Sequence, residues 1–242
     1  MSVIRGARER ARTEVTAAIK EEARRQLAAE GAARLSLRAV ARELGMASSA
    51  LYRYFPSRDD LLTALIIDAY DAVGAAAEEA LAATEGAAPA DRWIGVCRAL
   101  RDWAVDHPHE YGLVYGSPVP GYAAPQDTVA SAARGALSLI AVVRDARRDG
   151  VLGPPQGRPL AGEVRDDLAA LGSELVPELP VPTVAALVAA WAQVFGLVSF
   201  EVFGQFNGVV GARGPFFDQS AAALAAQVGL APADGAAVLP AK

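Results

Sequence analysis

Four side chains near the middle of the chain are of the types that perform catalytic or metal chemistry. His107, His109 and Glu110 lie close together, and Cys97 lies a few helical turns before them. Such a group could hold a metal ion or form a Cys–His nucleophile. The spacing matches no common zinc motif, however, and the two histidines flank Pro108 at the expected end of a helix. Because the chain also has no Gly-rich phosphate loop, the sequence predicts no catalysis, no metal site and no cofactor.

A second group of residues has the spacing of two short helices joined by a tight turn. Ser36 can cap a first short helix that ends near Leu44, and Gly45 can supply the positive φ of the turn. Ser48 or its neighbour can cap a second short helix that ends near Phe55. This pattern predicts a helix-turn-helix.

The packing residues of this stretch fit the same interpretation. Ala41 lies where the two short helices would cross, and its small side chain permits their close approach. A small core can form from the apolar residues Val40, Leu44, Met46 and Leu51. A helical hairpin inside an ordinary bundle is the alternative, but it would tolerate many other patterns.

The second short helix, from Ser48 to Tyr54, would be the recognition helix in the DNA major groove. Arg53 is suited to bidentate hydrogen bonds with a guanine edge, and hydroxyl groups suit phosphate contacts. Either Tyr52 or Tyr54 can instead pack on the preceding helix, and we favour Tyr52 as the DNA contact. The expected DNA-binding residues are Ser36, Arg38, Ser48, Ser49, Tyr52, Arg53, Tyr54 and Arg58.

Two helix N-termini flank this unit, at Ser36 and Arg58. Backbone N–H groups and positive charge at such ends favour phosphate binding. The alternative is that Ser36 and Ser57 act only as helix caps. Ser57 and Asp60 have the spacing of a capping box, so capping is the expected role of Ser57.

The charge distribution is asymmetric. Residues 1–58 hold twelve Lys and Arg against six Asp and Glu, whereas the rest of the chain holds eleven against twenty-two. The net charge of −5 hides this difference. A basic N-terminal part on an acidic body suggests that one end meets a polyanion such as DNA, and a solvated charged surface is the alternative.

Hydrophobic spacing predicts helices throughout and no convincing strand, so the expected fold is all-α. A mobile basic arm over residues 1–12 precedes a first helix from about Thr13 to Glu30, which Gly31 ends. Later helices are expected over 58–84, 91–106, 109–115, 128–148, 183–206 and 215–228, with 162–182 at best partly helical. The expected domains are a helix-turn-helix domain over 13–57, a helical domain over 58–230 and a flexible tail over 231–242.

The apolar segment 183–206 is long enough to be mistaken for a membrane span. It contains Gln193, Glu201 and Gln205, which a lipid-facing helix would rarely carry together, so we expect a buried helix and no membrane partner. The single cysteine excludes an intrachain disulfide. A lone thiol without a recognisable signal peptide predicts a cytoplasmic protein.

The stretch from Leu35 to Leu62 resembles the DNA-binding domain of the tetracycline-repressor-like (TetR) family. The hallmark of that domain is a Leu-Tyr-x-His/Tyr-Phe-x-Ser-Lys/Arg-x-x-Leu run after the turn, and residues 51–61 read LYRYFPSRDDL. Tyr54 stands where His is common and Arg58 where Lys is common. The resemblance implies a homodimer that binds a palindromic operator in double-stranded DNA.

The second half is similar to the WHG-type C-terminal domain of the same family. Trp191 and Gly196 fit its Trp-x-x-x-x-Gly signature, with Phe195 where the name implies His. The segment from His107 to Pro118 fits the same subgroup. This resemblance implies a helical domain for dimerisation and for binding a small apolar effector, and its usual outcome is repression relieved by the effector.

In this family two C-terminal helices pair with those of a second copy, and here they would be 183–206 and 215–228. A stripe at helical spacing gives the expected interface residues Ala192, Gly196, Ser199 and Phe203. The alternative is that this stripe packs within one chain. Glu201 could pair with a buried Arg, face solvent or bind a polar group on the effector.

The effector pocket is expected among the helices 58–84, 91–106, 128–148 and 183–206. Its candidate wall residues are aromatic, because an apolar pocket with few polar groups suits a hydrophobic effector. They are Trp103, Tyr111, Tyr115, Trp191, Phe195 and Phe200. Taken alone, an aromatic residue of this kind is more often an ordinary core residue than a ligand contact. Two other functions remain open: a constitutive DNA-binding regulator with a solid core, and a helical small-molecule carrier that does not bind DNA.

Overall fold

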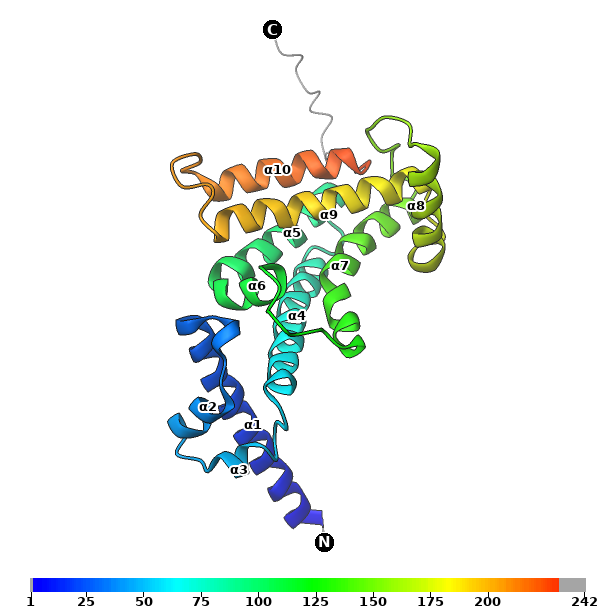
Figure 1. Cartoon of the computed structure of the whole chain (residues 1–242). Coiled ribbons are helices and arrows are strands. Elements are labelled where there is room, and N and C mark those ends of the chain that lie inside the picture. The colour runs from blue at the N-terminus through cyan, green and yellow to red at the C-terminus, as the bar shows by residue number, and fades with distance from the viewer. Residues whose placement is uncertain (1, 231–242) are drawn as a thin grey trace. The chain divides into compact units, whose positions relative to one another are not determined.

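The computed structural model describes residues 2–230, and these residues form ten α-helices and two short 3-10 helices (Figure 1). No strand is present within 2–230, although an isolated antiparallel bridge joins Leu152 and Leu230. The prediction of an all-α fold is therefore confirmed. The flexible tail predicted over 231–242 lies outside the described residues.

The chain divides into two compact units, and the division falls inside a long helix, α4 (Arg58–Ala83). The first unit comprises Met1–Asp71 and His107–Ala132, and the second comprises Ala72–Asp106 and Ala133–Lys242. The continuous helix predicted over 58–84 is thus present.

The first unit contains α1 (Ser2–Glu30), η1 (Ala32–Arg34), α2 (Leu37–Glu43), α3 (Ser48–Leu51) and the start of α4. Its core includes one face of α1, on which Ile19 and Ala23 are fully buried. Also in this unit are α6 (Pro108–Tyr115), the loop after it and η2 (Gln126–Thr128). Leu113, Val119 and Tyr122 of this later segment pack against the same core.

The first helix is longer than predicted. It begins at Ser2 instead of near Thr13, so residues 2–12 are helical and are not an unstructured arm. The physical reason is that this stretch has no proline and carries four Arg and two Ala, which favour helix. We predicted an arm there because the stretch has few apolar partners, but a lack of such partners does not by itself end a helix.

The second unit contains α5 (Pro89–Asp106), most of α7 (Val129–Arg148), α8 (Gly162–Leu175), α9 (Val181–Val202) and α10 (Arg213–Gln227). Helices α9 and α10 run side by side, and both pack against α5 (Figure 1). The segment that was predicted to be only partly helical forms the regular helix α8, which packs against α9. Its Pro/Gly-poor sequence from Glu163 to Leu175 permits this.

Helix α9 is long and apolar enough to cross a membrane by length and composition alone. Instead it packs against α5, α8 and α10, and buries Val184, Ala190, Val194 and Val198. A core helix of a helical domain passes the same test. The packing therefore agrees with the prediction that this segment is part of the helical bundle.

Candidate nucleic-acid interface

Helices α2 and α3 pack as the sequence spacing requires. Ala41 is buried at the contact between them, and its carbonyl accepts a 2.8 Å hydrogen bond from the backbone N–H of Met46. Gly45 has a φ of 63°, which confirms the predicted left-handed turn residue. Val40 and Leu51 are completely buried, and Leu44 and Met46 pack partly buried against the same core. The two helices thus form a helix-turn-helix supported by α1.

Helix α3 is shorter than the expected recognition helix. It ends at Leu51, and hydrogen-bonded turns carry the chain from Tyr52 to Phe55. Of the two expected cap positions, Ser48 or its neighbour, the structure has the neighbour Ala47 as the N-cap, without a side-chain hydrogen bond. Ser48 is instead the first helical residue, where its hydroxyl is not needed to cap the backbone.

Four of the eight predicted DNA contacts are exposed, and the other four are half-buried. Arg38, Ser49 and Arg53 are exposed, and Tyr52 is 41% exposed although it is a large aromatic residue. Ser48 is half-buried. Exposed arginine and hydroxyl groups at the end of a helix-turn-helix are the donors that base edges and phosphates require.

The two tyrosines differ as expected. Tyr54 is half-buried against the core, and the guanidinium of Arg12 on α1 lies 5.5 Å from the centre of its ring. This is cation–π geometry. Tyr54 therefore packs on the first helix, and Tyr52 is the tyrosine that faces solvent. The contact with Arg12 was not predicted, because residues 1–12 were expected to be mobile.

The two flanking helix ends have structural partners of their own. The Ser36 hydroxyl accepts a hydrogen bond from the backbone N–H of Ala39 at 3.4 Å, so it caps α2. Arg58 donates a 2.8 Å hydrogen bond to the carbonyl of Ala32 and contacts Asp59 at 3.2 Å. Its guanidinium therefore ties the start of α4 to η1, and phosphate contact by Ser36 and Arg58 stays a prediction. Ser57 caps α4 as predicted, because its hydroxyl accepts a 3.1 Å hydrogen bond from the backbone N–H of Asp60. The same hydroxyl donates a 2.7 Å hydrogen bond to the Asp60 carboxylate, so the carboxylate contacts the cap through this hydroxyl.

Asp68 on α4 holds the supporting helix α1 in place. Lys20 donates to Asp68 Oδ1 at 2.8 Å, and Arg24 donates to Asp68 Oδ2 at 2.7 Å. All three side chains are less than one-third exposed. Sequence reasoning missed this cluster, because the partners are separated by more than forty residues. The only local signal was an acidic residue in the apolar part of α4.

Four tyrosines gather in the first unit, on α4, on α6 and in the loop after α6. Tyr115 lies between Tyr70, at 5.8 Å edge to face, and Tyr111, at 5.1 Å. The Tyr70 hydroxyl donates to the carbonyl of Val114 at 3.2 Å. The hydroxyls of Tyr122 and Thr63 lie 2.9 Å apart. Burial and the neighbouring phenols raise the pKa values of Tyr70 and Tyr115, so both stay neutral at physiological pH.

The six predicted pocket residues are divided between the two units. Tyr111 and Tyr115 belong to the first unit, whereas Trp103, Trp191, Phe195 and Phe200 belong to the second. Within α9, Trp191 lines a hollow against α7 and α8, but Phe200 lines a groove against α10. The reason is helical geometry, since nine residues make about two and a half turns and place the two rings on opposite edges of the helix. Contact of any of the six with an effector stays a prediction.

The predicted interface residues share one side of α9. Ala192 is exposed, Phe203 is 45% exposed, and Gly196 and Ser199 are half-buried. Ala192 and Gly196 line a groove of about 640 Å³ between α9 and α10, together with the rings of Phe200, Phe206 and Phe216. No charged side chain lines this groove. Such an uncharged apolar face is typical of an interface between copies of a chain.

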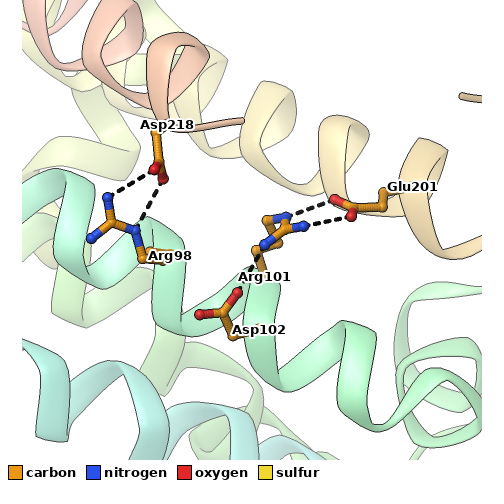
Figure 2. Close-up of polar contacts among 5 residues, drawn as sticks. All are labelled: Arg98, Arg101, Asp102, Glu201 and Asp218. Carbon is orange, nitrogen blue, oxygen red and sulfur yellow. Dashed lines mark hydrogen bonds and ion pairs between the residues drawn. The ribbon is translucent and has the colours of Figure 1, made fainter. Parts of the chain in front are cut away.

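Glu201 is buried behind this face and pairs with Arg101 of α5. The Arg101 Nε and Nη2 atoms donate to the two carboxylate oxygens at 2.7 and 2.6 Å (Figure 2). Arg101 also contacts Asp102 at 2.9 Å, and its guanidinium lies 5.7 Å from the ring centre of Phe217. The hydrogen bond with Glu201 raises the pKa of the guanidinium. Of the roles left open for Glu201, the structure supports pairing with a buried Arg.

A second ion pair joins α5 to α10. Arg98 donates to both carboxylate oxygens of Asp218, at 3.0 and 2.9 Å (Figure 2). Unlike Glu201, both side chains are substantially exposed. Two bidentate ion pairs from one face of α5 therefore connect α5 to α9 and to α10.

The residues of the candidate catalytic group are not assembled as a metal site. Cys97 is completely buried in α5, and burial raises the pKa of its thiol. His107 and His109 are exposed. No group of three or more metal-ligating side chains is present among residues 2–230. A neutral buried thiol is a core side chain, not a nucleophile.

The described residues form a helix-turn-helix near the N-terminus and a helical C-terminal unit. This combination is typical of bacterial helix-turn-helix transcription regulators. Two family descriptions match it: that of the bacterial regulatory proteins of the tetR family over residues 19–65, and that of the tetracyclin repressor-like C-terminal domain over residues 93–224. The chain belongs to the TetR family, and it is a transcriptional regulator with a DNA-binding domain.

Curated relatives agree with this assignment. The chain is 40% identical over 209 residues to the HTH-type transcriptional regulator Rv1816 of Mycobacterium tuberculosis, a match that covers 84% of this chain and 86% of the relative. The regulator Mb1846 of Mycobacterium bovis matches equally well. The predicted family is therefore confirmed.

Solved structures share the fold. The regulatory protein SCO4313 is 36% identical, with a TM-score of 0.72 over 89% of this chain and 97% of that chain. The TetR family regulator PfmR from Thermus thermophilus is 19% identical and has a TM-score of 0.55 over 87% of this chain and 96% of that chain. At 19% identity, the similarity to PfmR shows a shared fold alone.

Proposed function

We propose that this protein is a homodimeric, ligand-responsive repressor that acts in the cytoplasm. Two copies would bind the half-sites of a palindromic operator, about one DNA turn (~34 Å) apart. A small apolar effector would release the operator by binding more tightly to a conformation with a different spacing of the recognition helices. The change in operator affinity can only equal the difference in effector affinity between the two conformations.

The observation that carries the DNA-binding part is the exposed end of the helix-turn-helix. Arg53, Tyr52 and Ser49 are exposed there, whereas Leu51 and Phe55 between and beside them are buried. Because Leu51 and Phe55 pack into the core, the neighbouring polar side chains point outward to solvent. Arg53 is the group we expect to recognise a guanine edge, and the hydroxyls we expect to contact phosphates.

The homodimer is supported by the apolar face of α9 and α10. It carries Phe200 and Phe203 half-exposed and no charged lining residue, which is unfavourable for a surface in water. A second copy with the same face would cover it symmetrically. The stripe of Ala192, Gly196, Ser199 and Phe203 would lie at the centre of that contact.

The decisive experiment is selection of bound sequences from random DNA duplexes at two salt concentrations. We expect enrichment of a palindrome by the wild-type protein and weaker binding at the higher salt concentration, because phosphate contacts release counterions. Arg53→Ala should relax the base preference at one position of each half-site and weaken binding by about 1–3 kcal/mol.

Arg147→Ala is the matched control. Arg147 is an exposed arginine near the end of α7, in the second unit, and its loss should leave the enriched sequence unchanged. If the wild-type protein enriched no sequence and showed no salt-dependent binding, the proposed function would be wrong. An unchanged preference in the Arg53 variant would exclude Arg53 as the base-reading residue.

A further inference from the structure

A separate hollow lies in the second unit, between α7, α8 and α9. Its volume is about 340 Å³. Its deepest residues are Leu139, Val176, Val184 and Leu187, all buried, and its rim includes Val188 and Trp191. This volume is at the lower end of the range of small-molecule sites.

The lining of this hollow is uniformly apolar. Every residue around it is Ala, Leu, Ile or Val, except for Trp191 at the rim. No carboxylate, ammonium, guanidinium, amide or hydroxyl group lines it. A buried charge in such a place would find no partner, and a buried polar group would find at most the indole N–H.

Helix α8 forms one wall of the hollow and packs closely on α9. The distance from Val184 to the position that a Cβ on Gly172 would occupy is only 3.2 Å, so the absence of a side chain at Gly172 permits this approach. Beyond α8, Glu178 forms an ion pair with Arg144 of α7. These contacts hold α7, α8 and α9 together around a space that their own side chains do not fill.

An unfilled apolar space of this size is unfavourable. Leu175, Val188 and Trp191 at its rim are exposed, so its apolar walls contact solvent when it is empty. Water gains few hydrogen bonds in such a hollow, whereas an apolar molecule would remove its walls from water. The hollow therefore favours an apolar occupant over solvent.

We propose that this hollow is the effector site and that its ligand is an uncharged, apolar small molecule, one that needs no hydrogen bond from the protein. The proposal rests on the proposed function, because it names the site and the chemical class of that effector. It differs from the predicted pocket, since of the six aromatic residues only Trp191 lines the hollow and α8 replaces α4 and α5 as a wall.

A second copy of the chain is the competing occupant. The α9 residues in the hollow are Val184, Leu187, Val188 and Trp191, whereas the predicted interface stripe runs through Ala192, Gly196, Ser199 and Phe203. At 3.6 residues per turn the two sets face directions about a quarter of a turn apart. A second copy on the stripe would therefore leave the hollow to a small molecule.

The test uses two dyes with one carbon skeleton. N-phenyl-1-naphthylamine is neutral, and 1-anilinonaphthalene-8-sulfonate is the same molecule with a sulfonate. Titrated into the full chain without DNA, the neutral dye should bind with an affinity at least about tenfold higher, because the sulfonate would be buried without a partner. Equal affinities for the two dyes would overturn the proposed ligand class.

Variants of α7 locate the binding site. Ala136→Phe fills the hollow and should weaken binding of the neutral dye at least about tenfold, by occupying its space. Ala130→Phe makes the same change at an exposed position of α7 that does not line the hollow, and it should leave binding unchanged. If Ala136→Phe had no effect, or if dye binding per chain fell as the chains dimerised, the hollow would not be the effector site.

The two proposals fail separately in these experiments. A chain that enriches an operator but does not bind the neutral dye is a DNA-binding regulator without this site. A chain that binds the dye but enriches no DNA has the apolar site and lacks the proposed regulatory function.

Discussion

Arg101 and Glu201 form a bidentate ion pair that buries a carboxylate between α5 and α9. The side chain of Glu201 is 8% exposed and that of Arg101 is 16% exposed. Such a pair gains little over an apolar contact of the same shape, but removal of one partner leaves the other buried and unpaired. The pair therefore constrains which residues these two positions can hold.

We expect Glu201→Gln to lower the free energy of unfolding by about 3 kcal/mol, because the Arg101 charge loses its buried partner. Asp218→Asn breaks the exposed pair with Arg98 and should cost less than about 1 kcal/mol. Urea unfolding followed by circular dichroism measures both. Equal losses in the two variants would show that burial of Glu201 does not determine the strength of its pair.

Gly45 is expected to be needed for the turn of the helix-turn-helix. Its φ of 63° suits glycine, and a Cβ there would meet no atom within 4 Å, so strain and not a clash decides the outcome. Gly45→Ala should destabilise the protein by about 1 kcal/mol. Gly162→Ala, at the first residue of α8 and equally free of neighbours, is the control and should not be destabilising. Thermal unfolding of both variants provides the comparison.

The apolar face of α9 should control dimerisation. Phe203→Glu places a carboxylate where a second copy would exclude water, so the dimer should dissociate at concentrations at least roughly thirtyfold higher than for the wild type, as for an interface hot spot. Val151→Glu is the matched control, because Val151 is 55% exposed and lies beyond the end of α7. Sedimentation equilibrium measures the dissociation constant. If the Phe203 variant dimerised as tightly as the wild type, the dimer interface would have to lie elsewhere.

Cys97 is expected to make stability fall in alkaline solution. Burial raises the pKa of its thiol above the ordinary value of 9.0. Below pH 9.0 the thiol is neutral in both states, whereas at higher pH the unfolded chain loses a proton that the folded chain keeps. The free energy of unfolding should therefore decrease as the pH rises above 9.0.

The thiol contribution can be separated from that of the tyrosines. Tyr70 and Tyr115 also have raised pKa values, so Cys97→Ala should reduce the alkaline loss without removing it. Urea unfolding of both proteins from pH 8 to pH 11 gives the two slopes. Identical slopes would contradict the role of Cys97, as would rapid reaction of the native thiol with a disulfide reagent at pH 8.

Several features of the DNA-binding unit could be predicted because their causes are local. The turn depends on Gly45, and the start of α4 depends on Ser57 and Asp60, three residues apart. The length of α1 was predicted less well. Its first turns carry few apolar residues, so hydrophobic spacing gave no signal there, although helix propensity did.

Partners that are distant in the sequence could not be predicted. Glu201 was recognised as an unusual carboxylate in an apolar helix, but its partner Arg101 lies one hundred residues earlier. Asp68 pairs with Lys20 and Arg24, which lie 48 and 44 residues earlier in the chain. Both acidic residues could be noticed in the sequence, yet neither partner could be named.

The sequence by itself determined the helical class, the helix-turn-helix and the TetR family, because these depend on residue types at short, fixed spacings. Only the tertiary structure decided that Arg58 binds the Ala32 carbonyl, that Trp191 and Phe200 line different hollows, and that α8 completes an apolar site. The physical reason is that helical periodicity fixes which side chains share a face. Which faces meet depends on packing between segments that are far apart in the chain.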